Sequence, residues 1–286
     1  MSKPIQSDLS STKREAPSSK RPIRVHIENY VQATRIEPHL HTDLLQLLTP
    51  SHGIIKVASS DAYWTVPPAR GILIPPRFEH AATTLGSTMI IVADIHPSAL
   101  AGSDRRCRLV NISELTRALL STISTMSPDY PLDSPASRLV DVLVDQIEAA
   151  PSEPLRLPKP ADAKLRAITD TLMDKPDDKT TLSHWSASLG ISQRTLTRLF
   201  YAETGMGFRA YKARVQMHVA LGLLATDKPL SQIALDLGYE NQSSFIYAFR
   251  SWMGISPGRY RSDPAAQASS MGDDECLDIE DQRRRQ

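Results

Sequence analysis

The sequence predicts an α+β protein with an N-terminal antiparallel β-barrel, two helices that follow it, and a C-terminal all-α domain. Short apolar segments, rich in β-branched residues and separated by proline and glycine, occupy residues 23–96. A proline-rich stretch then interrupts this pattern, and helical periodicity continues from there almost to Tyr260. A chain of 286 residues is long enough for two hydrophobic cores. We expect a β domain at 23–150, a linker at 151–162 and a helical domain at 163–261.

The charged residues are segregated along the chain although their sum is nearly zero. The chain has 33 lysines and arginines against 32 aspartates and glutamates, a formal net charge of +1. Residues 182–261 nevertheless hold nine basic and four acidic side chains. A basic helical region in a balanced protein indicates a surface that faces a polyanion, although a solvated helical surface would show the same balance.

The two ends of the chain are predicted to be disordered and opposite in charge. Residues 1–22 form a basic arm rich in serine, lysine and proline, and 262–286 form a tail with seven acidic and three basic side chains. The only cysteines are Cys107 and Cys276, which fits a reducing cytosol without structural disulfides. Because the sequence shows no secretory signal and no membrane-length apolar run, we expect a cytoplasmic protein without membrane contact.

The β domain is predicted from three segments, "GIIKVAS", "AYWTVPPARGILIPP" and "TMIIVADIHP". Apolar runs of strand length between turn-forming residues are typical of a small antiparallel barrel. Two helices should follow, at about 112–126 and 134–149. The second carries an apolar stripe at helical spacing: Leu139, Val140, Leu143, Val144 and Ile147. This stripe requires burial, either on the β domain or against a second copy of the chain, and its periodicity leaves both open.

The helical domain contains an internal repeat. The segment "LSHWSASLGISQRTLTRLFYAETG" (182–205) aligns with "LSQIALDLGYENQSSFIYAFRSWMG" (230–254) when one residue is inserted. Each copy consists of a short helix, a glycine and a longer helix, which predicts a helix-turn-helix unit. Ser192 and Asn241 are expected to cap the longer helices. A continuous helix over 208–224 should hold the two units at a fixed separation.

The longer helix of each unit has one apolar face and one polar face. Leu196 and Phe200 in the first copy, and Phe245 and Phe249 in the second, lie at the spacing of a buried stripe. The opposite face begins with the exposed first turn, which is the part of a recognition helix that enters the major groove. An all-helical interaction domain is the alternative, and the duplicated frame with its caps and positive charge favours DNA. The candidate DNA-contacting residues are Ser192, Gln193, Arg194, Thr195, Thr197, Arg198, Gln242, Ser243, Ser244, Tyr247 and Arg250.

Three segments of the helical domain carry a family resemblance: "LGISQRTLTRLF", "ALDLGYENQSSFIYAFR" and "GISPGRYR". Through them, residues 163–261 resemble the DNA-binding domain of the AraC/XylS family of bacterial transcription regulators. The resemblance implies two helix-turn-helix units joined by a linker helix. It places base reading first on Arg194, Thr197 and Arg198, and then on Gln242, Ser243, Ser244 and Tyr247. Many members have a basic residue where this chain has Tyr247, which would leave the second unit mainly to hold the DNA backbone.

Two segments of the β domain, "PHLHTDLLQLLTPSHG" and "PPRFEH", resemble the two motifs of the cupins. In cupins paired histidines, a glutamate and a later histidine can bind a divalent metal inside a small β-barrel. Here Gln46 stands in place of the anionic glutamate and Arg77 in place of a glycine. An amide is a poor substitute for a carboxylate on such an ion, so we expect ordinary hydrogen-bonded or pocket-lining histidines and no cofactor. The weak metal candidates are His39, His41 and His80.

The two resemblances together predict a one-component transcription regulator and not an enzyme. Residues 163–261 would bind a specific site on double-stranded DNA, and the β domain would sense a small-molecule effector, dimerise, or both. RNA polymerase is a further candidate partner. The alternatives are a ligand-independent dimeric regulator and, less favoured, a cupin metalloenzyme with a helical appendage. The candidate effector-pocket residues are His39, His41, Gln46, Trp64 and His80, although for Trp64 core packing is favoured over stacking on a ligand.

Overall fold

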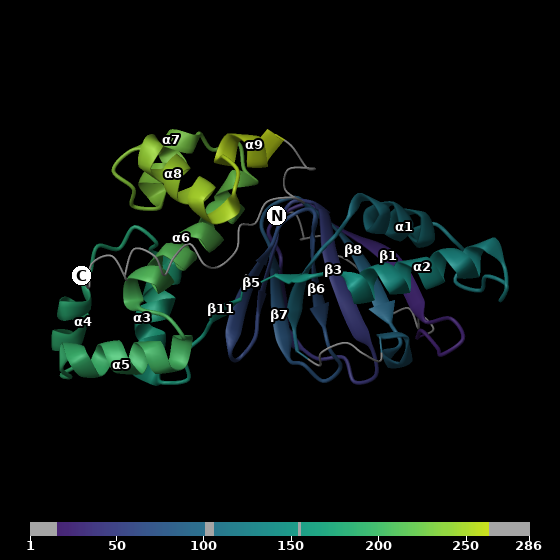
Figure 1. The fold of residues 1–286 in the computed structure, drawn as a ribbon, viewed down its shortest axis with the longest axis horizontal. Coiled ribbons are helices and arrows are strands. Elements are labelled where there is room, and N and C mark those ends of the chain that lie inside the picture. Colours follow the sequence, from purple (N-terminus) through teal and green to yellow (C-terminus); the bar gives the residue numbers. More distant parts are fainter. Residues whose placement is uncertain (1–15, 101–105, 154–155, 263–286) are drawn as a thin grey trace, which may run out of the picture.

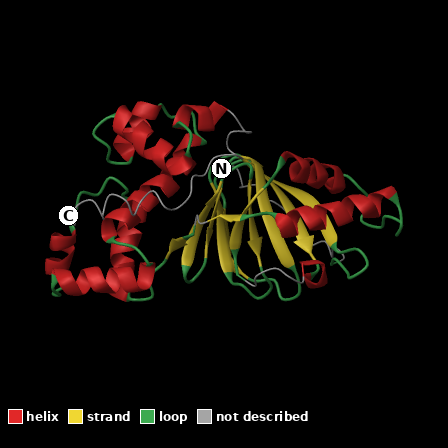
Figure 2. Ribbon diagram, viewed as in Figure 1, coloured by secondary structure: helices red, strands yellow, loops and turns green. Residues whose placement is uncertain are grey.

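Two antiparallel sheets face each other in the N-terminal half of the molecule (Figures 1 and 2). The computed structural model describes residues 16–100, 106–153 and 156–262. One sheet has the strand order β1-β8-β3-β6-β9-β10, and the other has the order β11-β5-β4-β7-β2. The strands are β1 (Ile23–Tyr30), β2 (Arg35–His39), β3 (Leu45–His52), β4 (Ile55–Ala58), β5 (Ala62–Val66), β6 (Arg70–Ile74), β7 (His80–Thr84), β8 (Thr88–Ile95), β9 (Arg108–Asn111), β10 (Ser152–Glu153) and β11 (Leu157–Pro158). The predicted α+β class with an antiparallel β domain is confirmed.

Most of the predicted basic arm and acidic tail lies outside the described residues, which begin at residue 16 and end at 262. Cys276 lies in the same undescribed part of the chain. Cys107 is buried in the core between the two sheets, and this burial raises the pKa of its thiol well above the usual range.

Side chains from both sheets fill the space between them. Leu48 and Ile72 from the six-stranded sheet join Val57 and Trp64 from the five-stranded sheet in one buried cluster. Successive residues of a strand point to opposite faces, so Leu47, next to Leu48, lies on the outer face and belongs to a second buried cluster. The six-stranded sheet is therefore apolar on both faces.

Two helices, α1 (Glu114–Ser124) and α2 (Pro135–Ala149), cover that outer face (Figure 1). Ser113 and Ser134 cap them by accepting hydrogen bonds from backbone N–H groups of their first turns. Of the predicted stripe on α2, Val140, Leu143 and Ile147 are buried, with exposed fractions of 1% or less. The stripe packs on the chain's own β domain, which resolves the choice that periodicity left open. A short 3-10 helix, η1 (Pro97–Leu100), follows β8.

The segment predicted as a linker lies along the barrel as two short strands. β10 pairs with β9, and β11 pairs with β5. Arg156 forms an ion pair with Asp61, with 2.5 Å between Nη2 and Oδ2. Lys159 N donates to the Asp61 carbonyl, and Leu157 is fully buried. The chain thus reaches the helical domain along a fixed path on the five-stranded sheet.

The C-terminal half is helical, with α6 at its centre (Figure 1). The helices are α3 (Ala163–Asp174), α4 (Leu182–Ser188), α5 (Gln193–Thr204), α6 (Phe208–Leu224), α7 (Leu230–Asp236), α8 (Gln242–Met253) and α9 (Pro257–Ser262). The pairs α4–α5 and α7–α8 are the two predicted helix-turn-helix units, each built on its own apolar cluster. The predicted continuous helix between them is confirmed with the same bounds.

The turn of each unit contains a glycine with a left-handed backbone. Gly190 has φ 65° and Gly238 has φ 81°, a region that costs other residues steric strain. A Cβ at Gly238 would lie 2.8 Å from the Asp177 Cα, whereas a Cβ at Gly190 would meet nothing within 4 Å. The second turn is therefore held against the α3–α4 connection, while the first lies open.

The barrel and the helical domain share an interface along α6, β5 and β11 (Figure 1). The Tyr63 hydroxyl donates to Asp170 Oδ1 at 3.1 Å, and the Tyr211 hydroxyl donates to the Pro158 carbonyl at 2.9 Å. His218, on the barrel side of α6, is 1% exposed, with its Nδ1 3.1 Å from Thr65 Oγ1. None of the helices in the described residues has the length and hydropathy needed to cross a membrane.

Candidate DNA-binding surface and histidine cluster

The first recognition helix, α5, presents a capped and exposed N-terminal turn. Ser192 Oγ accepts a hydrogen bond from the Thr195 backbone N–H at 3.1 Å, as predicted for an N-cap. Leu196 and Phe200 are fully buried and attach the helix to the domain core. The opposite face is exposed at every predicted DNA-contacting position of this helix: Ser192, Gln193, Arg194, Thr195, Thr197 and Arg198.

The hydroxyl groups on α5 are partly committed to local bonds. Thr197 Oγ1 donates to the Gln193 carbonyl at 2.9 Å, and Thr195 Oγ1 lies 2.8 Å from Ser192 Oγ. In contrast, Arg194 and Arg198 form no ion pair with any described residue. The two guanidinium groups are therefore the side chains on this surface with the most free hydrogen-bond donors.

The second recognition helix, α8, repeats this arrangement. Asn241 Oδ1 accepts from the Ser244 backbone N–H at 2.9 Å, which confirms the predicted cap, and Phe245 and Phe249 are fully buried. Tyr247 stands out from the surface with 77% of its side chain exposed. The predicted DNA-contacting residues of this helix are all exposed: Gln242, Ser243, Ser244, Tyr247 and Arg250.

One basic residue beside this surface was missed by the sequence reasoning. Arg259, at the start of α9, lines a surface hollow together with Arg250, Gly254, Ile255 and Ser256. The signal was present, because Arg259 lies in the quoted segment "GISPGRYR". Two guanidinium groups around one hollow suit an anionic group such as a phosphate.

The three histidines of the β domain come together at one end of the barrel. His39 and His80 are register partners on β2 and β7, with ring centroids 4.4 Å apart. His41 follows β2, with its ring centroid 5.2 Å from that of His39 and 5.8 Å from that of His80. Arg77 donates its backbone N–H to the His41 carbonyl at 2.6 Å. Its φ of 62° lies in the left-handed region that favours glycine.

Hydrogen bonds fix two of these rings. Nδ1 of His39 donates to the Glu37 carbonyl at 2.9 Å, and Nδ1 of His80 donates to the Phe78 carbonyl at 3.0 Å. Nε2 of His80 and Nε2 of His41 are buried and have no hydrogen-bond partner in the described part of the chain. Burial lowers the pKa of His80 to about 4, and burial together with the charge of His39 lowers the pKa of His41.

The other two candidate pocket residues have different surroundings. The Gln46 side chain lies beside His41, and its Nε2 donates to Asp94 Oδ1 on β8 at 3.2 Å. Trp64 is 2% exposed and packs in the core, edge-on to Phe78. The structure thus places Gln46 beside His41 and Trp64 among apolar side chains.

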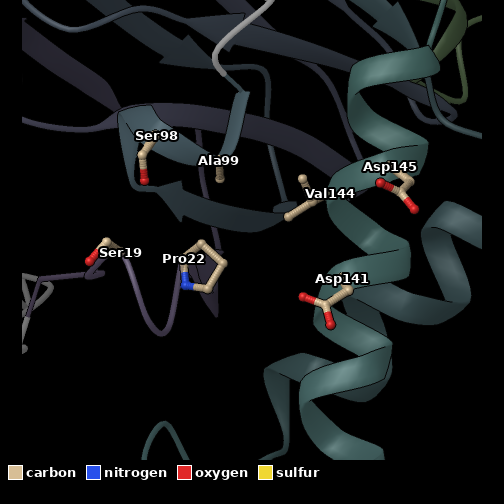
Figure 3. Close-up of a pocket in the computed structure, with 7 residues that line it drawn as sticks. All are labelled: Ser19, Pro22, Ser98, Ala99, Asp141, Val144 and Asp145. Atoms are coloured by element: carbon tan, nitrogen blue, oxygen red, sulfur yellow. The ribbon is translucent and has the colours of Figure 1, made fainter. Parts of the chain in front are cut away.

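A separate hollow of about 210 Å³ lies between α2, η1 and the segment that precedes β1 (Figure 3). Asp141, Val144 and Asp145 of α2 line one side of it. The other side is lined by η1 and by the segment that precedes β1. None of the candidate effector-pocket residues contributes to it.

Comparison with known proteins identifies the family. The model described as "Helix-turn-helix domain" matches residues 185–263. A protein of Streptomyces antibioticus described as an AraC-like transcription regulator is 30% identical over 105 residues, 36% of this chain and 35% of that protein. The HTH-type transcriptional regulator NimR of Escherichia coli is 31% identical over 215 residues, 75% of this chain and 78% of NimR. The chain belongs to the AraC/XylS family.

As a member of this family, the protein is a DNA-binding transcription regulator. The names of the relatives describe regulators and not enzymes, so the comparisons give no support to the metalloenzyme alternative. The solved structure of ToxT from Vibrio cholerae aligns over 84% of this chain and 98% of ToxT, with 14% identity and a TM-score of 0.35.

Proposed function

We propose that this regulator reads a promoter site by placing the N-terminal turns of α5 and α8 in two successive segments of the major groove. The main observation in support is that both helices bury one face in the domain. Each also exposes a capped first turn on its opposite face. The two helices lie at opposite ends of α6 (Figure 1), whose 17 residues span roughly 25 Å. This length is of the same order as the spacing of about 34 Å between successive groove segments on one side of DNA.

The residues on these turns suit distinct roles. Arg194 and Arg198 can each donate two N–H groups to O6 and N7 of a guanine. The backbone N–H groups at the start of each helix suit phosphate oxygens, which fix the register of the protein on the duplex. Tyr247 offers an aromatic ring that can contact a thymine methyl group. Arg250 and Arg259, which line one hollow, are proposed to bind the DNA backbone beside the second unit.

The β domain is proposed as the sensing and dimerising part of the molecule. The histidine end of the barrel is the proposed effector site, because it holds buried polar atoms that no described residue satisfies. A second copy is proposed to contact the outer helices, where Leu115 of α1 and Val142 of α2 expose apolar side chains. The proposal also includes the domain division at 23–150, 151–162 and 163–261. It further includes action in the cytoplasm and contact with RNA polymerase.

Substitution of the two arginines tests the DNA-contact assignment. The operator is first located by footprinting the full-length protein on the DNA beside its own coding region. Arg194→Ala and Arg198→Ala should each weaken binding to that operator by about 1–3 kcal/mol and relax sequence preference at one or two base pairs. Arg35→Ala is the control, because Arg35 is an exposed arginine on β2, outside the helices proposed to contact a second copy. Unchanged operator affinity in both test variants would reject the assignment.

A further inference from the structure

The segment between α3 and α4 lies against both helix-turn-helix units. It spans residues 175–181 and leads into α4 of the first unit. A local hydrogen bond orders its turn, because Asp178 Oδ1 accepts the Thr180 backbone N–H at 2.7 Å. The segment also packs on the turn of the second unit, where a Cβ at Gly238 would lie 2.8 Å from the Asp177 Cα. The two units therefore meet at a point outside their apolar cores.

Two side chains of α6 bind the backbone at this meeting point. Lys212 Nζ donates to the Asp178 carbonyl. One helical turn later, Gln216 Nε2 donates to the Leu237 carbonyl at 2.7 Å and, over a longer distance of 3.5 Å, to the Pro176 carbonyl. Leu237 is the C-cap of α7, at a helix end whose carbonyls lack partners within the helix. Because an amide NH₂ group has two N–H donors, one side chain serves a carbonyl of the second unit and a carbonyl of the segment that leads into the first.

The apolar clusters leave the angle between the two units dependent on α6. Tyr211 and Val215 of α6 belong to the cluster of the first unit, and Leu221 and Leu224 belong to that of the second. Gln216 is the central residue of α6 and lies between these two sets. A long helix can bend, and bending here would tilt one recognition helix relative to the other. The hydrogen bonds of Gln216 oppose this bending.

We propose that Gln216 is a positioning residue that sets the relative orientation of α5 and α8, and thereby the number of base pairs between the two DNA segments that the regulator reads. This inference rests on the proposed function, because it requires both helices to enter the major groove. Each base pair advances the groove by about 3.4 Å and turns it by roughly 35°. A tilt of similar size between the helices would therefore change or remove the preferred spacing.

A distance between the two recognition helices can be measured without DNA. Nitroxide spin labels are attached to the full-length protein at two exposed positions, through Ala202→Cys on α5 and Ser251→Cys on α8. Cys276→Ser removes the cysteine of the C-terminal segment, and Cys107 is retained because it is buried. Pulsed electron paramagnetic resonance then gives the distribution of distances between the labels.

Gln216→Met tests the positioning role in this labelled protein. Methionine keeps the length and helix propensity of glutamine but has no N–H donor. The variant should broaden the distance distribution, whereas Gln232→Met, at an exposed glutamine on α7, should retain the wild-type distribution. A distribution in Gln216→Met as narrow as that of wild type would overturn the proposal.

Operator spacing tests the consequence for DNA recognition. The Kd is measured at one salt concentration for the footprinted operator and for versions with one base pair inserted or removed between the two protected segments. Wild type should bind the altered spacings about 10-fold more weakly or worse, as for a mismatched contact. Gln216→Met should reduce this preference at least about threefold, the effect expected from a lost hydrogen bond. A smaller folded fraction would instead lower the affinity for every spacing by the same factor.

Scrambled operators separate this inference from the proposed function. If scrambling either protected segment leaves wild-type binding unchanged, the two-segment function is wrong and the role of Gln216 in DNA recognition falls with it. If both segments matter, the role of Gln216 alone is overturned by a wild type without a spacing preference, or by a Gln216→Met variant that keeps the full preference.

Discussion

At the residue scale, His218 shows how a polar side chain acquires a role that no local pattern indicates. It lies on α6 among apolar residues, and its surroundings include Thr65 and Lys56 from the barrel and Arg214 from its own helix. Complete burial, followed by the charges of Arg214 and Lys56, lowers the pKa of His218 to about 3 from the ordinary value of 6.5. The ring is therefore neutral in the folded protein.

This lowered pKa predicts a loss of stability in acid. Because the folded-state pKa is below the unfolded value, the unfolded chain binds more protons as the pH falls from about 6.5 toward 3, and stability falls over that window. The loss due to His218 should be about 2 kcal/mol at pH 5. Chemical denaturation at pH 7 and pH 5 measures it.

His218→Asn is the matched variant, because asparagine keeps a polar group near Thr65 but does not titrate. Its difference in stability between the two pH values should be smaller than that of wild type by roughly the contribution of His218. Part of the slope will remain, since burial also lowers the pKa of His41 and His80. Equal slopes in the variant and wild type would contradict the prediction.

At the element scale, the sequence predicted the features that depend on local chemistry. The caps at Ser192 and Asn241 and the bounds of α6 are confirmed, because capping and glycine turns are written within a few residues. The partner of the α2 stripe and the pairing of β10 and β11 depend on distant strands. Periodicity cannot select among such surfaces. The partner of the α2 stripe was therefore left open, and the pairing of β10 and β11 was not predicted.

The same limit applies to the histidine cluster. The spacing of His39 and His41, and the later His80, was enough to select the three residues. No local pattern associates Asp94 with Gln46, since 48 positions separate them and only the pairing of β3 with β8 joins them. The expectation of ordinary histidines relied on Gln46 and Arg77, and the pairing of β3 with β8 adds the Asp94 carboxylate to the surroundings of Gln46.

The two helix-turn-helix turns allow a matched prediction at the element scale. Gly190→Ala and Gly238→Ala each place a Cβ on a left-handed backbone, which should cost about 1–2 kcal/mol of stability. Gly238→Ala should cost more than Gly190→Ala, because its Cβ would lie 2.8 Å from the Asp177 backbone. Urea unfolding of the two variants measures the difference. Equal losses would mean that the α3–α4 connection moves away without a cost.

At the scale of the whole molecule, α6 contributes to two hydrophobic cores and also contacts the barrel. One end contributes Tyr211 and Val215 to the cluster of the first helix-turn-helix unit, and the other contributes Leu221 and Leu224 to that of the second. His218 and Gly222 face the barrel. A helix with three neighbours is at least partly buried on nearly every side, and within α6 only Arg209 is exposed although the helix also carries other polar and charged side chains.

Because α6 contacts the barrel and both helix-turn-helix units, we predict that the two domains unfold together. Gly222 packs so closely on the barrel that an added Cβ would lie 2.8 Å from Leu85 Cδ1. Gly222→Leu should preserve α6, since leucine favours helix, but should wedge the interface open at a cost of about 1–3 kcal/mol. Calorimetry should show one transition for wild type and two for this variant.

Gly258→Leu, at a helical glycine with open space around it, should retain a single transition. A single transition in Gly222→Leu would show that the domains are coupled mainly through β11 and the Tyr63–Asp170 hydrogen bond rather than through α6.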